Sequence, residues 1–167
     1  FEGDVPEQRV VDIVKAAAEL KVAEIALADT IGVADPWTVR RRIEAARKVA
    51  GDIPLRLHFH DTRNTGLANA FAGVEAGVDI LDASVGGLGG CPFAPNATGN
   101  IGTEDLVYML ERAGYETGYD LSKLIEIGNW VVAQACAQLA RLREAGVADL
   151  TMSINVSVAQ LLRGDLI

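Results

Sequence analysis

The chain has 167 residues, which is enough for one domain but fewer than the ~250 residues that a complete eight-stranded α/β barrel usually needs. Half of the residues are hydrophobic and 23% are charged, so the chain can build a core and wholesale disorder is excluded. The 15 Lys and Arg residues stand against 23 Asp and Glu residues, and the net charge is -8. Because an acidic chain repels phosphate backbones, we expect no nucleic-acid partner.

The sequence predicts neither a membrane segment nor a secretory signal. No apolar run approaches the ~20 residues that span a bilayer, and the first ten residues lack a basic region followed by an apolar one. Two cysteines, Cys91 and Cys136, are too few for a disulfide framework, so we expect free thiols and a cytoplasmic location. In the tail, we expect Cys136 to be a buried helix residue. Because the chain opens on Phe1 and runs directly into a helical pattern, we expect an excised or truncated piece.

Helical and strand-like patterns alternate along the first two thirds of the chain. The predicted helices are residues 6–20, 36–50, 65–77 and 103–113, and the predicted strands are residues 24–29, 53–61 and 78–86. This order predicts an α/β fold with a parallel sheet. The site is expected where the strands deliver their carboxyl ends, which is where Asp29, His58, His60 and Ser84 fall.

The only two histidines, His58 and His60, lie two residues apart on one predicted strand, so the alternation sends both imidazoles to the same face. Such a pair could bind one metal ion, or nearby carbonyls and carboxylates could satisfy it. We favour the metal-binding interpretation because the pair ends a predicted parallel strand and is followed at once by Asp61, Thr62 and Asn64.

A glycine-rich loop, residues 86–90, precedes Cys91. Its four glycines would let the backbone approach a ligand closely or close over it as a lid. Cys91 could then serve as a proton donor or nucleophile if a metal, a cation or a helix N-terminus adjusts its pKa. The alternative is a plain turn in which Cys91 is only a small apolar residue.

Other polar residues near these segments carry weaker signals. Asn96 and Asn100 precede the predicted helix at residue 103, and for Asn96 we predict a turn or cap role. Glu104 lies in the first turn of that helix, where the helix dipole favours an acidic side chain. Asp29 could form an ordinary turn at the end of its strand, or it could support a metal ligand or transfer a proton.

Together, these segments resemble the hydroxymethylglutaryl-CoA lyase family, metal-dependent enzymes on a (β/α)8 barrel that are related to the isopropylmalate and homocitrate synthases. The resemblance rests on LADTIGVADP (27–36), LHFHDTRNTGLAN (57–69), ASVGGLGGCPFAPNATGN (83–100) and TEDLVYML (103–110), in family order. The synthases share the H-x-H strand, whereas GLGGCPFA is typical of the lyases. The resemblance covers residues 1–125 and implies a partial TIM-type barrel, namely its last three βα units.

The resemblance also implies roles for individual residues. His58, His60 and Asn100 would be the ligands of a divalent metal, Mg²⁺ or Mn²⁺, Cys91 the catalytic thiol on a mobile loop, and Asp29 a polar residue of the catalytic site. The implied reaction is the cleavage of 3-hydroxy-3-methylglutaryl-CoA to acetyl-CoA and acetoacetate, so the implied partner is an acyl-CoA. The metal would bind the tertiary hydroxyl of the substrate, and Cys91 would protonate the enolate that leaves.

The family's first strands supply a further carboxylate ligand and an arginine, and no segment of this chain corresponds to them. We therefore expect no lyase turnover by the isolated chain. Three strands cannot close a barrel, so we also expect open strand edges and one bare apolar face that favour homo-oligomers.

The rest of the chain, residues 126–167, is predicted to be a separate helix-strand-helix piece. The sequence predicts a long helix over residues 121–145, a strand over 148–157 and a short helix over 158–167. This piece resembles part of an EAL-type cyclic-di-GMP phosphodiesterase domain. That resemblance would make Asn155 a metal ligand, but the other ligands of that family have no counterpart, so we expect no phosphodiesterase activity.

Two other function classes stay open. One is a related acyl-CoA condensing synthase of the isopropylmalate or homocitrate type, which Cys91 in its glycine loop disfavours. The other is a non-catalytic half-barrel that pairs with itself or with a missing partner.

Overall fold

The structure is a computed structural model, and it describes residues 3–90, 99–147, 149–152, 154 and 156. The predicted site residue Cys91, together with Asn96 and Asn155, lies outside the described residues. Contacts divide the chain into two compact units. The first unit comprises Phe1–Asp82 with Gly90–Asn100, and the second comprises Ala83–Gly89 with Ile101–Ile167.

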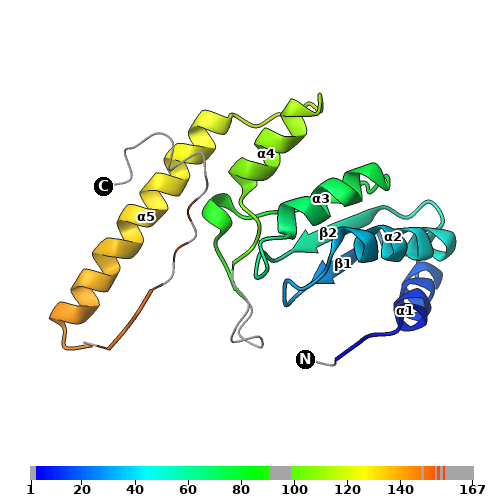
Figure 1. The fold of residues 1–167 in the computed structure, drawn as a ribbon, viewed down its shortest axis with the longest axis horizontal. Coiled ribbons are helices and arrows are strands. Elements are labelled where there is room, and N and C mark those ends of the chain that lie inside the picture. Colours follow the sequence, from blue (N-terminus) through cyan, green and yellow to red (C-terminus); the bar gives the residue numbers. More distant parts are fainter. Residues whose placement is uncertain (1–2, 91–98, 148, 153, 155, 157–167) are drawn as a thin grey trace. The chain divides into compact units, whose positions relative to one another are not determined.

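The first unit alternates helices and strands. Its elements are α1 (Glu7–Glu19), β1 (Ile25–Asp29), α2 (Pro36–Ala50), β2 (Leu55–Phe59), α3 (Gly66–Glu75) and β3 (Ile80–Leu81) (Figure 1). The three strands form one parallel sheet in the order β1-β2-β3. The predicted α/β class and the predicted parallel sheet are confirmed, and each helix of this unit lies within two residues of its predicted bounds.

One face of the sheet is covered by helices and forms the core. Leu55, Leu57 and Phe59 of β2 are at most 3% exposed. Helix α3 packs so closely on this face that a Cβ atom at Gly73 would lie 2.3 Å from Cδ1 of Leu57. Alternation along β2 therefore puts apolar side chains under the helices and the residues between them, including His58, on the other face.

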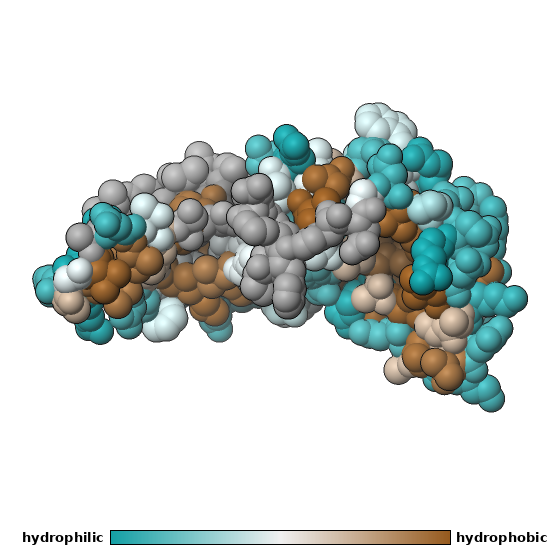
Figure 2. Space-filling model, turned by 90° about the horizontal axis from the view of Figure 1, so that it is seen from below, coloured by the Kyte–Doolittle hydropathy of each residue, from teal (hydrophilic) through white to brown (hydrophobic). Residues whose placement is uncertain are grey.

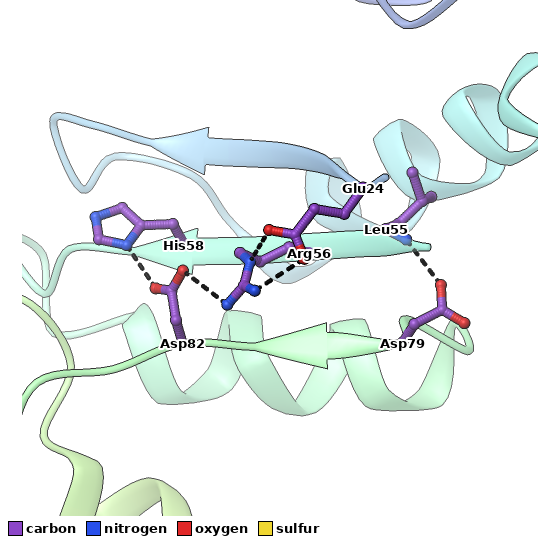
Figure 3. Close-up of polar contacts among 6 residues, drawn as sticks. All are labelled: Glu24, Leu55, Arg56, His58, Asp79 and Asp82. Carbon is purple, nitrogen blue, oxygen red and sulfur yellow. Dashed lines mark hydrogen bonds and ion pairs between the residues drawn. The ribbon is translucent and has the colours of Figure 1, made fainter. Parts of the chain in front are cut away.

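The other face of the sheet carries a row of polar side chains on β2, beside Ala26, Ala28 and Ile80, which share this face by their register. The expectation of a bare apolar face that favours homo-oligomers stays a prediction. Glu24, Arg56, His58 and Asp82 lie along this face and are joined by hydrogen bonds and ion pairs (Figure 3). The reason is the alternation of β2, which gives its apolar residues to the helix-covered face. Figure 2 shows apolar patches on the visible surface that are interspersed with hydrophilic residues.

The third predicted strand, residues 78–86, is much longer than β3, which contains only Ile80 and Leu81. These two residues pair with Arg56 and Leu57 of β2. Beyond residue 82 the chain changes partner, because Ser84 pairs with Gly102 instead. The apolar run is therefore divided between two pairings, which an unbroken sequence pattern does not show.

The second unit contains the short 3-10 helix η1 (Val85–Gly87), α4 (Thr103–Arg112) and α5 (Leu121–Glu144). Helix α5 buries Leu124, Ile125 and Gly128, and a Cβ atom at Gly86 would lie 3.9 Å from Cα of Gly128. The predicted domain boundary between residues 125 and 126 falls inside this helix.

Two expectations for the tail are wrong. Cys136 is exposed on α5, because the buried residues of that helix are confined to its first two turns. The described residues of the predicted strand at 148–157, which are 149–152, 154 and 156, form no strand. The predicted helix at 158–167 lies outside the described residues. Among the helices of the described part, none is both long and apolar enough to cross a membrane.

Hydrogen bonds lower the pKa of several carboxyl groups in the first unit. The backbone N–H of Leu55 and then the side chain of Arg47 lower the pKa of Asp79, and the N–H of Thr38 lowers that of Asp35. A carboxyl whose folded pKa is depressed stabilises the fold fully above its unfolded pKa, and this stabilisation is lost as the pH falls through the folded pKa.

We therefore predict that the first unit loses stability as the pH falls below about 4, the ordinary range of an Asp carboxyl. The variant Asp79→Asn should lose part of this dependence, because its side chain no longer titrates. Hydrogen exchange of α2 and β2 between pH 6 and pH 3 measures the effect. Asp52→Asn, at an exposed position between the same two elements, is the control. Equal pH slopes in Asp79→Asn and the unchanged chain would contradict the prediction.

Candidate metal centre at the carboxyl end of the sheet

The two histidines lie together at the end of β2. Their ring centroids are 5.2 Å apart and the ring planes meet at 73°. His60 is 5% exposed, whereas His58 is partly exposed. The alternation therefore has the predicted effect, since both imidazoles lie on one face of the sheet.

Asn100 lies beside the histidine pair although it is distant in sequence. It forms an isolated antiparallel bridge with His60, and the backbone N–H of Asp61 donates to the carbonyl oxygen of Gly99 at 3.1 Å. Residues that face each other in such a bridge place their side chains on the same face. The Oδ1 atom of Asn100 is buried. The structure thus brings together His58, His60 and Asn100, the three predicted metal ligands.

The ring of His58 contacts a carboxylate through its Nδ1 atom. Its Nδ1 atom lies 2.6 Å from Oδ1 of Asp82, the first residue after β3 (Figure 3). The other carboxylate oxygen of Asp82 lies 3.7 Å from Nη1 of Arg56. Arg56 also donates two hydrogen bonds of 2.9 Å to Glu24, and this contact lowers the pKa of Glu24 and raises that of Arg56.

Asp82, Arg56 and Glu24 were not among the predicted site residues. The signal that could have found Arg56 is the alternation itself, because Arg56 and His58 of β2 and His60, which follows it, lie at every second position. Asp82 directly follows β3, so it lies at the carboxyl end of a strand, as Asp29 and the histidines do. Its contact with His58 depends on the strand register in which Arg56 lies opposite Ile80, and this register cannot be read from the sequence.

Asp29 is occupied by its own turn. Its carboxylate accepts hydrogen bonds from the backbone N–H of Val33 at 3.1 Å and of Ala34 at 2.9 Å. In the β1 to β2 register Asp29 lies opposite Phe59, and Ala28 lies opposite His58. The structure therefore does not bring Asp29 into contact with the histidines, and its catalytic role stays a prediction.

Hydrogen bonds join the loop after β2 to α3, and join residues at the start of α3 to the loop after β1. Asp61 accepts a hydrogen bond from the N–H of Gly66, the first residue of α3, at 2.8 Å. The side chains of Thr65 and Asn69 both donate to the carbonyl oxygen of Ala34. The backbone that follows His60 is therefore linked both to the loop after β1 and to α3.

The glycine-rich loop begins in a defined conformation in the second unit. Gly86 and Gly87 have φ values of 65° and 63°, which favour glycine. The N–H of Gly86 donates to the carboxylate of Glu104 at 2.9 Å, and Glu104 is 0% exposed. Cys91, at the far end of the loop, lies outside the described residues, and so its role as the catalytic thiol stays a prediction.

The donor set fits a divalent metal ion. Imidazole nitrogens and an amide oxygen are suitable ligands for such an ion when water or substrate oxygens fill its other positions. Within residues 3–90 and the described residues from 99 onward, no group of three or more His, Cys, Asp or Glu side chains could hold a metal. His58, His60 and Asn100 therefore stay the predicted ligands.

A parallel α/β sheet with this pair of histidines at its carboxyl edge fits part of a (β/α)8 barrel, and the solved lyase structures that share the fold assign it to that class. The family model described as HMGL-like matches residues 1–131, and the chain belongs to this family.

Two curated relatives are closely similar in sequence. The chain is 45% identical over 133 residues to the hydroxymethylglutaryl-CoA lyase YngG of Bacillus subtilis. The aligned region covers 78% of this chain and 44% of the relative. The chain is 46% identical over 133 residues to the (R)-citramalyl-CoA lyase of Chloroflexus aurantiacus, which covers 80% of this chain and 42% of the relative. The chain thus spans less than half of the length of these relatives.

Two solved structures share the fold. An HMG-CoA lyase from Acinetobacter baumannii in complex with coenzyme A and 3-methylmalate has a TM-score of 0.75 at 45% identity, over 80% of this chain and 44% of its own. The hydroxymethylglutaryl-CoA lyase of Pseudomonas aeruginosa has a TM-score of 0.75 at 34% identity, over 98% of this chain and 50% of its own. The second similarity extends beyond residue 131 into the tail. The EAL-type resemblance of the tail stays a prediction.

Proposed function

We propose that this chain supplies the metal-binding side of the active site of a lyase that cleaves 3-hydroxy-3-methylglutaryl-CoA to acetyl-CoA and acetoacetate. The observation that carries the proposal is the convergence of His58, His60 and Asn100 at the carboxyl end of β2. The membership of the HMGL-like family and the similarity to lyases of CoA thioesters support it.

In the proposed reaction His58 and His60 would hold a divalent ion, Mg²⁺ or Mn²⁺, through ring nitrogens, and Asn100 would hold it through its amide oxygen. When bound, such an ion would polarise the tertiary hydroxyl of the substrate and favour its deprotonation. A base takes that proton, the carbon–carbon bond breaks to leave acetoacetate, and the acetyl-CoA enolate takes up a proton. Cys91 is the proposed donor of that proton, and Asp29 is proposed as a polar group of the same site.

A second substrate of the same reaction type is favoured by one observation. The (R)-citramalyl-CoA lyase is as similar to this chain as the hydroxymethylglutaryl-CoA lyase is. The identity to these relatives therefore does not by itself favour one of the two acyl groups. We propose a 3-hydroxyacyl-CoA lyase as the class and 3-hydroxy-3-methylglutaryl-CoA as its first substrate.

The metal site is tested by titrating the chain with Mn²⁺ and measuring the free ion by electron paramagnetic resonance. We predict saturable binding of one Mn²⁺ that weakens in His58→Ala, His60→Ala and Asn100→Ala by more than the ~10–100-fold typical of lost supporting partners. Asn129→Ala, on α5, is the matched control for Asn100→Ala. Absence of saturable binding would overturn the proposed metal site.

Turnover is a separate measurement. We expect the metal-loaded chain to form no acetoacetate from 3-hydroxy-3-methylglutaryl-CoA, because the family's further carboxylate ligand and arginine have no counterpart in it. Measurable acetoacetate would refute this expectation and would show that the residues of this chain suffice for the reaction.

A further inference from the structure

The side chain of Asp82 is fixed by partners on both of its oxygens. Oδ1 lies 2.6 Å from Nδ1 of His58, and Oδ2 lies 3.7 Å from Nη1 of Arg56. Its backbone is held as well, since the N–H of Asp82 donates to the carbonyl oxygen of Leu57 at 3.3 Å. Figure 3 shows that the carboxylate points along the sheet face toward the histidine ring.

The contact with Asp82 determines which ring nitrogen of His58 carries the proton. A carboxylate only accepts hydrogen bonds, so the nitrogen 2.6 Å from it must be the donor. In a neutral imidazole the other nitrogen is then an acceptor with a free lone pair. The Nε2 atom of His58 is thereby presented as a ligand atom, and the ring cannot rotate without breaking the bond.

Arg56, which lies beside Asp82, is itself held by Glu24. Arg56 directs a two-pronged contact to Glu24 through Nε and Nη2, with both distances 2.9 Å. Such a fork fixes the plane of the guanidinium group. The side chains of Glu24, Arg56, His58 and Asp82 are between 29% and 41% exposed, so water competes only in part for these contacts.

We propose that Asp82 is a positioning residue that holds His58 in the Nδ1–H tautomer, and that the Glu24–Arg56 pair keeps Asp82 in place. The link from this tautomer to metal binding rests on the proposed function, whereas the tautomer itself does not. Partners of this kind raise the affinity of a metal site by orienting its ligands, and their loss typically costs ~10–100-fold in affinity.

The tautomer is measured in the metal-free full chain by ¹⁵N NMR of the histidine rings, above the pH range in which imidazole titrates. We expect the Nδ1–H form of His58 in the unchanged chain. Asp82→Ala should shift His58 toward the Nε2–H form. Asp82→Asn keeps the side-chain volume and should reduce the preference, because an amide can either donate or accept. An unchanged tautomer in both variants would overturn the proposal, and the Asn variant keeps the test valid if the Ala variant does not fold.

The control is Asp79→Asn, three residues earlier on the other side of β3. Asp79 contacts the same neighbouring strand by accepting a hydrogen bond from the N–H of Leu55 at 2.8 Å, whereas the carboxylate beside His58 is that of Asp82. The variant Asp79→Asn should reduce the stability of the first unit and leave the tautomer of His58 unchanged. A tautomer change as large as that in Asp82→Asn would mean that general loosening of the sheet, not Asp82, determines the ring state.

Metal affinity gives the second readout. We expect Asp82→Ala to weaken Mn²⁺ binding by ~10–100-fold and Arg56→Met to weaken it less, since Arg56 acts through Asp82. Unchanged Mn²⁺ affinity in Asp82→Ala would overturn the positioning role. If the unchanged chain binds no Mn²⁺, the proposed function fails while the tautomer measurement still decides the role of Asp82.

Discussion

Replacing Glu104 with alanine is expected to destabilise the second unit by about 3 kcal/mol. The carboxylate is 0% exposed and accepts the backbone N–H of Gly86 at 2.9 Å. Truncation would leave that N–H without its acceptor and would open a cavity at the start of α4. The position of Glu104 in the first turn of α4 adds a favourable interaction with the helix dipole, which the alanine variant also loses.

The conservative variant Glu104→Gln separates these contributions. Its side chain has nearly the same volume and keeps one carbonyl oxygen for Gly86, so we expect a loss of about 1 kcal/mol. The free energy of opening is measured by hydrogen exchange at Gly86 and along α4. Glu111→Ala, at an exposed position of the same helix, is the control and should change stability by at most ~0.5 kcal/mol. Equal exchange rates in Glu104→Ala and Glu111→Ala would contradict the structural role of the buried carboxylate.

The case of Glu104 shows where sequence reasoning is limited. The sequence indicates a helix start and an acidic residue that suits it, and α4 does begin at Thr103. That acid is fully buried, and its hydrogen-bond donor is the N–H of Gly86, which lies 18 residues earlier. An acid in a first turn is usually solvated, and no local pattern distinguishes it from one that binds a loop.

The histidine pair could be predicted because its geometry is local. Strand alternation alone puts the rings of His58 and His60 on one face. The approach of Asn100 is not local, and its predicted role came from the resemblance to the lyase family. Asp82 was missed because its contact with His58 depends on the register between β2 and β3.

The turn after β1 gives the complementary lesson. Asp29 was predicted as a site residue because it ends a parallel strand. The structure uses its carboxylate for the N–H groups of Val33 and Ala34, a local arrangement that is typical of Asp before a turn. Position at a strand end therefore locates the region of the site, and hydrogen bonding decides what each residue there is free to do.

Replacing Gly32 with alanine is expected to have the second large effect, about 3 kcal/mol of lost stability in the first unit. Gly32 has a φ of +64°, which an alanine adopts only with strain. In addition, its Cβ atom would lie 2.5 Å from Oγ1 and 2.8 Å from the backbone nitrogen of Thr62. Rotation of the Thr62 side chain cannot relieve the backbone clash, so the loop after β2 must move.

Gly51→Ala is a matched control for this variant, because Gly51 has a φ of +61° and nothing lies within 4 Å of its Cβ position. It should lose only the conformational cost that its backbone angles, φ 61° and ψ -129°, impose on an alanine, because no atom lies near the added Cβ atom. The difference between the two variants then measures the close approach of the two loops. Since Thr62 follows His60 by two residues, Gly32→Ala should also weaken Mn²⁺ binding, whereas Gly51→Ala should not. Equal stability losses in the two variants would show that the loops do not meet at Thr62. The loop after β1 would then not hold the backbone near His60 in place.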